Sequence, residues 1–155
     1  MTNTFAQKKS TVLSAQESDP VKMGWMQGFP PPQDKIITAA SGTFFQFPQI
    51  RWSVVNMRQL LPTVEVSRGL KAPSVLPYQL DKHIDSITFL PWNEKQMMTW
   101  ETSLWKNYTD GIIILHKGRV VYERYVGALK EDRVHAVMSL TKSFTGTLAA
   151  ILVAE

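Results

Sequence analysis

The stretch Met138-Ser-Leu-Thr-Lys-Ser-Phe-Thr-Gly146 opens the most apolar part of the chain, which runs from Phe144 to Ala154. Residues three apart share one face of a helix, so the amine of Lys142 can reach the hydroxyl of Ser139. The first turn of a helix also presents backbone N–H groups and a positive dipole end, which suit a reacting carbonyl. The pattern predicts a helix from Ser139 to Ala154 with a serine nucleophile and a lysine base at its start.

The lysine can act as a base only when its amine is neutral. Burial disfavours the charged form of a lysine, so this chemistry favours a buried position for Lys142 against the apolar helix. The alternative is an N-cap serine followed by a surface lysine, and the spacing by itself favours neither. Thr141, Ser143 and Thr145 could add hydroxyl groups to such a site, but residues of this type in a first turn more often serve packing and capping.

A second tetrad of the same spacing, Ser103-Leu-Trp-Lys106, lies elsewhere in the chain. Ser103 falls near the carboxyl end of a predicted helix, where the dipole is negative and no oxyanion site forms. We therefore interpret this tetrad as a solvated helix end.

Apolar side chains cover almost the whole circumference of the Ser139–Ala154 helix, as is typical of a helix buried on all sides. The set comprises Phe144 and the run from Leu148 to Val153. The other elements of the chain are too few to surround such a helix. We expect the 155 residues to form the N-terminal portion of a larger domain, with its C-terminal part missing.

Two further elements precede this helix. Gly111–His116 and Arg119–Val126 are rich in β-branched residues and are separated by Lys117-Gly118, which predicts a tight antiparallel hairpin. Because Ile112 to Leu115 is apolar on both faces, we expect the first strand to be interior to a sheet. Apolar spacing with Asn93 as N-cap predicts a helix over residues 94–106.

The proline distribution divides the chain. All nine prolines lie between Pro20 and Pro91. We expect a polar, flexible segment over residues 1–22, a proline-rich arm packed on the domain over 23–91, and the regular part of a truncated domain over 92–155. Within the arm, a helical turn is predicted over residues 56–61 and short strands over 64–66 and 87–89.

Composition excludes several classes of function. The net charge is +4 and no basic block exceeds two residues, so the sequence gives no support for nucleic acid as a partner. The absence of cysteine excludes disulfides and thiolate chemistry, and His83, His116 and His135 lack metal-ligand spacing. No export signal or stretch long enough to span a membrane is visible, so we expect no membrane partner and a cytoplasmic location.

The region from Met138 to Gly146, preceded by the hairpin, resembles the active-site serine region of the β-lactamase and penicillin-binding-protein superfamily of serine hydrolases. Two upstream stretches, Gly24-Trp-Met-Gln-Gly-Phe-Pro-Pro31 and Arg51-Trp52 through Arg68-Gly69, resemble the class C-like branch that includes 6-aminohexanoate-dimer hydrolases and related esterases. The resemblance spans about residues 22 to 155.

The resemblance implies a β-lactamase/transpeptidase-like α/β (α+β) fold, with an antiparallel sheet flanked by helices, here present only as its N-terminal part. It also implies a serine hydrolase that cleaves a small-molecule amide or ester through an acyl-Ser139 intermediate, with Lys142 as base and no metal or organic cofactor. The tyrosine and the Lys-Thr-Gly-like element that complete such sites have no counterpart up to Glu155. We therefore expect these residues alone to be inactive. The alternative is a non-catalytic fragment or a binding protein of the same fold.

Overall fold

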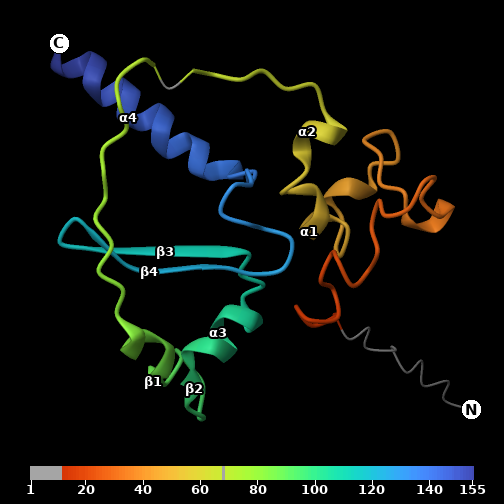
Figure 1. The fold of residues 1–155 in the computed structure, drawn as a ribbon, viewed down its shortest axis with the longest axis horizontal. Helices are drawn as coiled ribbons and strands as arrows, with labels where there is room; N and C mark the ends of the chain where they lie inside the picture. Colours follow the sequence, from red (N-terminus) through yellow and green to blue (C-terminus); the bar gives the residue numbers. More distant parts are fainter. Residues whose placement is uncertain (1–11, 68) are drawn as a thin grey trace, which may run out of the picture.

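The longest sheet element is the hairpin that the sequence predicts. In the computed structural model, which describes residues 12–67 and 69–155, β3 (Gly111–His116) pairs antiparallel with β4 (Arg119–Tyr125) (Figure 1). Lys117 and Gly118 form the turn, with φ angles of 50° and 75°. Two successive positive φ angles match the twist of the flanking strands, so the predicted hairpin is confirmed.

The interior strand of this sheet is β4 rather than β3. The extended segment 77–81 runs along the outer edge of β4, where Gln79 N–H donates to the carbonyl of Val120 at 2.9 Å and Asp81 N–H donates to that of Val121 at 2.8 Å. Among the described residues, β3 pairs with β4 alone. Ile113 and Leu115 of β3 are 49% and 47% exposed, so the apolar strand expected inside a sheet lies at an edge of the described part.

The predicted helix over residues 94–106 is half as long in the structure. The α-helix α3 covers Trp100–Lys106, and its N-cap is Thr99, whose hydroxyl accepts the N–H of Thr102 at 3.1 Å. Asn93, the expected cap, has a φ of 59° and lies in a turn. The extended residues β2 (Met98–Thr99) directly precede α3, so the helix begins only after a strand that local spacing did not predict.

A second short hairpin and several helical turns make up the rest of the arm. The strands β1 (Thr88–Phe89) and β2 pair antiparallel, in agreement with the strand expected over 87–89. No strand forms at residues 64–66. The remaining elements are the helices α1 (Ile50–Ser53) and α2 (Met57–Leu60) and the 3-10 turns η1 (Gln33–Lys35), η2 (Thr43–Phe45) and η3 (Lys82–Ser86).

The described core of the arm is small and aromatic. Trp25, Ile37 and Trp52 are buried against one another. Side chains that are apolar and partly buried pack around them, namely Met23, Met26, Phe44 and Leu60. Tryptophans bury large areas, so two of them can organise a segment that has little regular secondary structure.

The segment before this core is packed in its described portion. Ala15 and Ser18 are 2% and 0% exposed, and Ser18 N–H donates to the carbonyl of Ser14 at 2.9 Å. The sequence had suggested a flexible segment over 1–22, and for residues 12–22 the structure differs. Residues 1–11, the other part of that prediction, lie outside the described residues.

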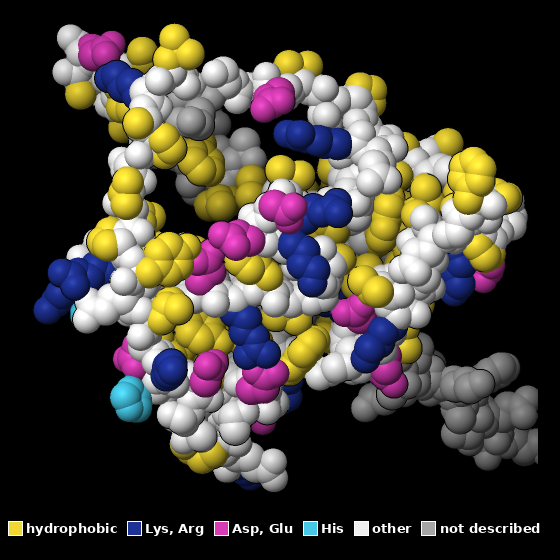
Figure 2. All heavy atoms as spheres, viewed as in Figure 1, with side chains coloured by type: hydrophobic (Ala, Val, Ile, Leu, Met, Phe, Trp, Pro, Cys, Tyr) yellow, Lys and Arg dark blue, Asp and Glu magenta, His cyan; other side chains and the backbone are white. Residues whose placement is uncertain are grey.

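The last helix, α4 (Thr141–Ala154), follows the 3-10 turn η4 (Met138–Leu140), which a loop joins to the end of β4, and it is drawn above the hairpin in Figure 1. None of its residues is buried. Hydrophobic side chains gather at the upper left of Figure 2, the region in which α4 lies. Phe144, Leu148 and Leu152 are 64%, 62% and 72% exposed. A helix that the sequence predicts to be buried is thus uncovered in the described part of the chain. In that part, no helix has both the length and the apolar content needed to cross a bilayer.

Two tyrosine hydroxyls donate hydrogen bonds to the carboxylate of one residue of β4, Glu123. Glu123 accepts the hydroxyls of Tyr78, at 2.5 Å, and of Tyr125. The hydrogen bonds from Tyr125 and Tyr78 lower the pKa of Glu123. The same bond to Glu123 raises the pKa of Tyr125 to about 12.

We expect one tyrosine to ionise near pH 12, followed as tyrosinate absorbance during an alkaline titration. A tyrosine whose pKa is raised on folding stabilises the fold fully below its unfolded pKa, about 10, and loses that contribution as the pH rises through the folded value. Glu123→Gln removes the charge and should return the Tyr125 transition toward its ordinary range. An unchanged titration in Glu123→Gln contradicts this assignment.

Candidate active site

Ser139 lies in η4, directly before α4 begins at Thr141. The residue preceding it, Met138, has a φ of 45°, in the left-handed region that a methionine rarely adopts. Backbone in such conformations is characteristic of functional sites, where the surroundings hold it. The turn brings Ser139 to the amino-terminal end of the 14-residue helix, as the sequence predicts. The unusual φ of Met138 has no signal in the sequence.

The side chains of the first tetrad are in direct contact. The ammonium group of Lys142 lies 3.1 Å from the hydroxyl oxygen of Ser139 and donates to it. Both residues are exposed, as is the whole of α4. The burial that we expected for Lys142 is therefore not provided by the described residues. The reason is the same one that leaves α4 uncovered: no described element lies over this face.

In the second tetrad, Ser103 and Lys106 contact other residues rather than each other. The hydroxyl of Ser103 donates to the backbone carbonyl of Trp100 at 2.6 Å, and Ser103 is 6% exposed. Lys106 lies 4.0 Å from the carboxylate of Glu94. Ser103 is buried rather than solvated, and it is the fourth of the seven residues of α3 rather than near its carboxyl end, so our interpretation was wrong on both points. Its hydrogen bond within the helix agrees with a structural role.

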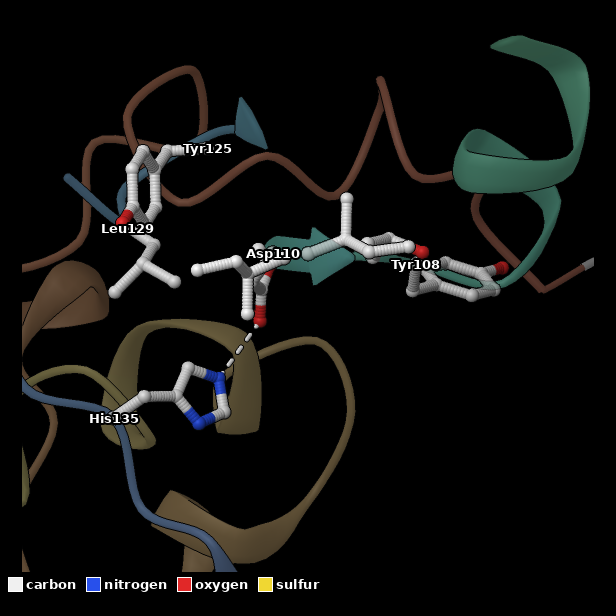
Figure 3. Close-up of a pocket in the computed structure, with 9 residues that line it drawn as sticks. Tyr108, Asp110, Tyr125, Leu129 and His135 are labelled. Carbon is white, nitrogen blue, oxygen red and sulfur yellow. Dashed lines mark hydrogen bonds and ion pairs between the residues drawn. The ribbon is translucent and has the colours of Figure 1, made fainter. Parts of the chain in front are cut away.

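A cluster that sequence reasoning missed lies beside the hairpin. The Oδ1 atom of Asp110 accepts a hydrogen bond from Arg51 Nη2 at 3.3 Å. Its Oδ2 atom lies 3.2 Å from Nε2 of His135 (Figure 3). His135 lies in the connection between β4 and η4. Arg51 and Asp110 are far apart in the chain, so no local pattern brings them together. A lone arginine in an amphipathic turn is the weak signal that could have indicated the cluster.

Two cavities adjoin this cluster. The first, about 410 Å³, is lined by aromatic and aliphatic side chains around Asp110 and His135, among them Tyr108, Tyr125 and Leu129 (Figure 3). The second, about 300 Å³, is also lined by Asp110 and His135, together with Phe47, Ile50 and Val54. Neither is lined by Ser139 or Lys142.

The other histidines lie at the surface. His83 is 2.9 Å from the carboxylate of Asp81, to which its ring and its backbone N–H are both bonded. His116 is the exposed last residue of β3, next to the turn at Lys117 and Gly118. Within the part of the chain that the structure describes, no group of His, Asp and Glu residues is arranged to hold a metal ion.

The C-terminal part of the chain is similar to a known protein family. Residues 101–155, which contain the hairpin, η4 and α4, match the family model described as Beta-lactamase. The match supports a partial β-lactamase-like serine hydrolase domain, and the mixture of helices and antiparallel strands in the chain agrees with it.

The chain is also similar to a 6-aminohexanoate-dimer hydrolase from Paenarthrobacter ureafaciens, with 31% identity over 109 residues. The matched region covers 70% of this chain and 25% of the relative, so the chain spans about a quarter of the relative's length. No solved structure matches the chain. The resemblance that the sequence suggests is confirmed at the level of the family.

Proposed function

We propose that this chain contributes the nucleophile and the base of a serine hydrolase that cleaves amide or ester bonds. The observation that carries the proposal is the 3.1 Å contact between Lys142 Nζ and Ser139 Oγ at the start of α4. The match of residues 101–155 to the β-lactamase family model supports it, as does the left-handed backbone of Met138.

The proposed reaction has two stages. With its amine neutral, Lys142 takes the hydroxyl proton of Ser139 while Ser139 Oγ forms a bond to the substrate carbonyl carbon. The tetrahedral intermediate then expels the amine or alcohol, which leaves with the proton that Lys142 had accepted. In the second stage, water attacks the acyl ester, its proton returns to Ser139 Oγ, and the carboxylic acid is released.

The described residues would supply only part of this machinery. The backbone N–H of Ser139 is one candidate oxyanion donor, whereas acyl transfer sites use preorganised donors in a water-excluded pocket. The exposed face of α4 matches this need for additional structure, because Phe144, Leu148 and Leu152 are apolar and uncovered. We propose that this face packs against the C-terminal part of the same domain, and that the 155 residues alone are inactive.

A non-catalytic role is the second candidate. It is favoured by the exposed position of Lys142, which differs from the buried, water-excluded position expected for a lysine base. In that case the chain would be a binding protein of the same fold, and the contact between Ser139 and Lys142 would be an ordinary contact between side chains three residues apart on an exposed helix.

Hydrolysis of a short p-nitrophenyl ester by the protein expressed from its own gene distinguishes these candidates. A serine hydrolase that forms an acyl intermediate should release a burst of p-nitrophenol equal to the concentration of sites, followed by a slower steady rate. Ser139→Ala should abolish both phases, and Ser103→Ala, the matched control, should leave them unchanged. A burst of full size in Ser139→Ala contradicts the proposal, and the absence of any burst in the unmodified protein favours the binding role.

A further inference from the structure

Three separate segments of the chain meet at the carboxylate of Asp110. Arg51 belongs to α1, Asp110 directly precedes β3, and His135 belongs to the connection between β4 and η4. Each carboxylate oxygen has its own partner. Oδ1 lies 3.3 Å from Arg51 Nη2. Oδ2 lies 3.2 Å from His135 Nε2 (Figure 3). The carboxylate therefore joins the arm, the hairpin and the segment that leads to Ser139.

The Arg51 side of this junction is rigidly held. Arg51 is 5% exposed, and its Nη1 donates to the carbonyl of Ala15 at 2.5 Å and to the hydroxyl of Ser18 at 3.1 Å. The backbone carbonyl of Asp110 accepts the N–H of Val126 at 2.8 Å, which closes the open end of the hairpin. With its main chain and one oxygen fixed in this way, the carboxylate presents Oδ2 to His135 in one orientation.

The residue after His135 is fixed as well. The N–H of Ala136 donates to the carbonyl of Val54, just beyond α1, at 2.7 Å. Two successive residues of the connecting segment are thus anchored, one through its side chain and one through its backbone. Ser139 follows three residues later, immediately after the left-handed Met138. Unusual backbone of this kind persists only where the neighbouring structure determines it.

We infer that Asp110, acting through His135, is a positioning residue for Ser139. It fixes the path of residues 135–138 so that Ser139 enters η4 within reach of Lys142. The inference rests on the proposed function, because the residue that Asp110 and His135 would position is the proposed nucleophile, Ser139. A displacement of about 1 Å at a reacting group can cost roughly 100-fold in rate, so a contact outside the chemistry can control the reaction.

Two substitutions of His135 separate this role from general packing. His135→Gln keeps a donor that can reach Asp110, whereas His135→Leu fills a similar volume without any donor. Glu101→Gln is the matched control, since Glu101 forms an ion pair with Arg124 that links α3 to β4 and does not involve the connecting segment.

The first readout is hydrogen exchange in the protein expressed from its own gene. His135→Leu should raise amide exchange in the peptide covering residues 127–140, whereas His135→Gln and Glu101→Gln should leave that peptide protected. Unchanged exchange in His135→Leu overturns the inference, whether or not Ser139 proves reactive. Should His135→Leu fail to fold, Asp110→Asn takes its place, with the same expected rise in exchange and the same contrary outcome.

The second readout is covalent labelling of Ser139 by a fluorophosphonate. The maximal rate constant of labelling should fall about 10- to 100-fold in His135→Leu, with little change in the half-saturating concentration, and His135→Gln should restore it. Loss of rate in Glu101→Gln to the same extent, or no rescue by glutamine, overturns the inference. Absence of labelling in the unmodified protein contradicts the proposed function instead, and the exchange experiment still tests the positioning contact.

Discussion

Replacement of Lys142 by alanine is expected to slow acylation of Ser139 by about 10²- to 10⁴-fold, the usual contribution of a positioned general base. Lys142 Nζ is 3.1 Å from the hydroxyl that must lose its proton. Binding of the substrate should change little, because the lysine acts on Ser139 rather than on the leaving group at that stage. Pre-steady-state release of p-nitrophenol measures the acylation rate directly.

Two control variants define what the lysine does. Lys142→Arg keeps a positive charge beside Ser139 but cannot be deprotonated, so it should be as slow as the alanine variant if the amine is a base. Lys106→Ala should acylate at the unmodified rate, since Lys106 faces Glu94 in the other tetrad. Full activity in Lys142→Arg would show that only the charge matters and would contradict the assigned role.

The second large effect is expected on stability. Arg51→Ala removes the partner of a carboxylate that is 16% exposed and also removes the hydrogen bonds to Ala15 and Ser18. Breaking a buried ion pair by deleting one partner costs about 3–5 kcal/mol. Because His135 still contacts the other oxygen of Asp110, the loss should lie at the lower end of this range, about 3 kcal/mol. We expect the free energy of unfolding of the protein to fall by that amount.

Urea unfolding followed by tryptophan fluorescence provides the measurement, because Trp52 is next to Arg51 in α1. Arg58→Ala is the matched control: Arg58 is an exposed arginine in α2, and its loss should change the free energy of unfolding by no more than about 0.5 kcal/mol. A loss below about 1 kcal/mol in Arg51→Ala would show that the cluster contributes little to the fold.

Features encoded by neighbouring residues could be predicted from the sequence. The turn at Lys117-Gly118 depends on two positive φ angles, for which a glycine after a β-rich run is a strong local signal. The contact between Ser139 and Lys142 depends on helical spacing, and it is present at the expected helix start. Both predictions required no knowledge of distant parts of the chain.

Features that depend on distant segments could not be predicted. The Arg51–Asp110 and Asp110–His135 contacts join residues 59 and 25 positions apart, and no periodicity relates them. The start of α3 was misplaced because β2 pairs with β1, and this pairing outweighs the helical spacing of residues 94–99. The apolar side chains around α4 predict that this helix is buried, but none of its residues is buried by the described part of the chain.

The central claim is that Ser139 is a nucleophile activated by Lys142, and peptide mapping after fluorophosphonate labelling tests it most directly. The protein expressed from its own gene is labelled, its intact mass is measured, and the modified residue is located by fragmentation. The account predicts one adduct per chain, on Ser139, which is lost in Ser139→Ala and retained in Ser103→Ala. An adduct on Ser103, or unchanged labelling of Ser139→Ala, would contradict it.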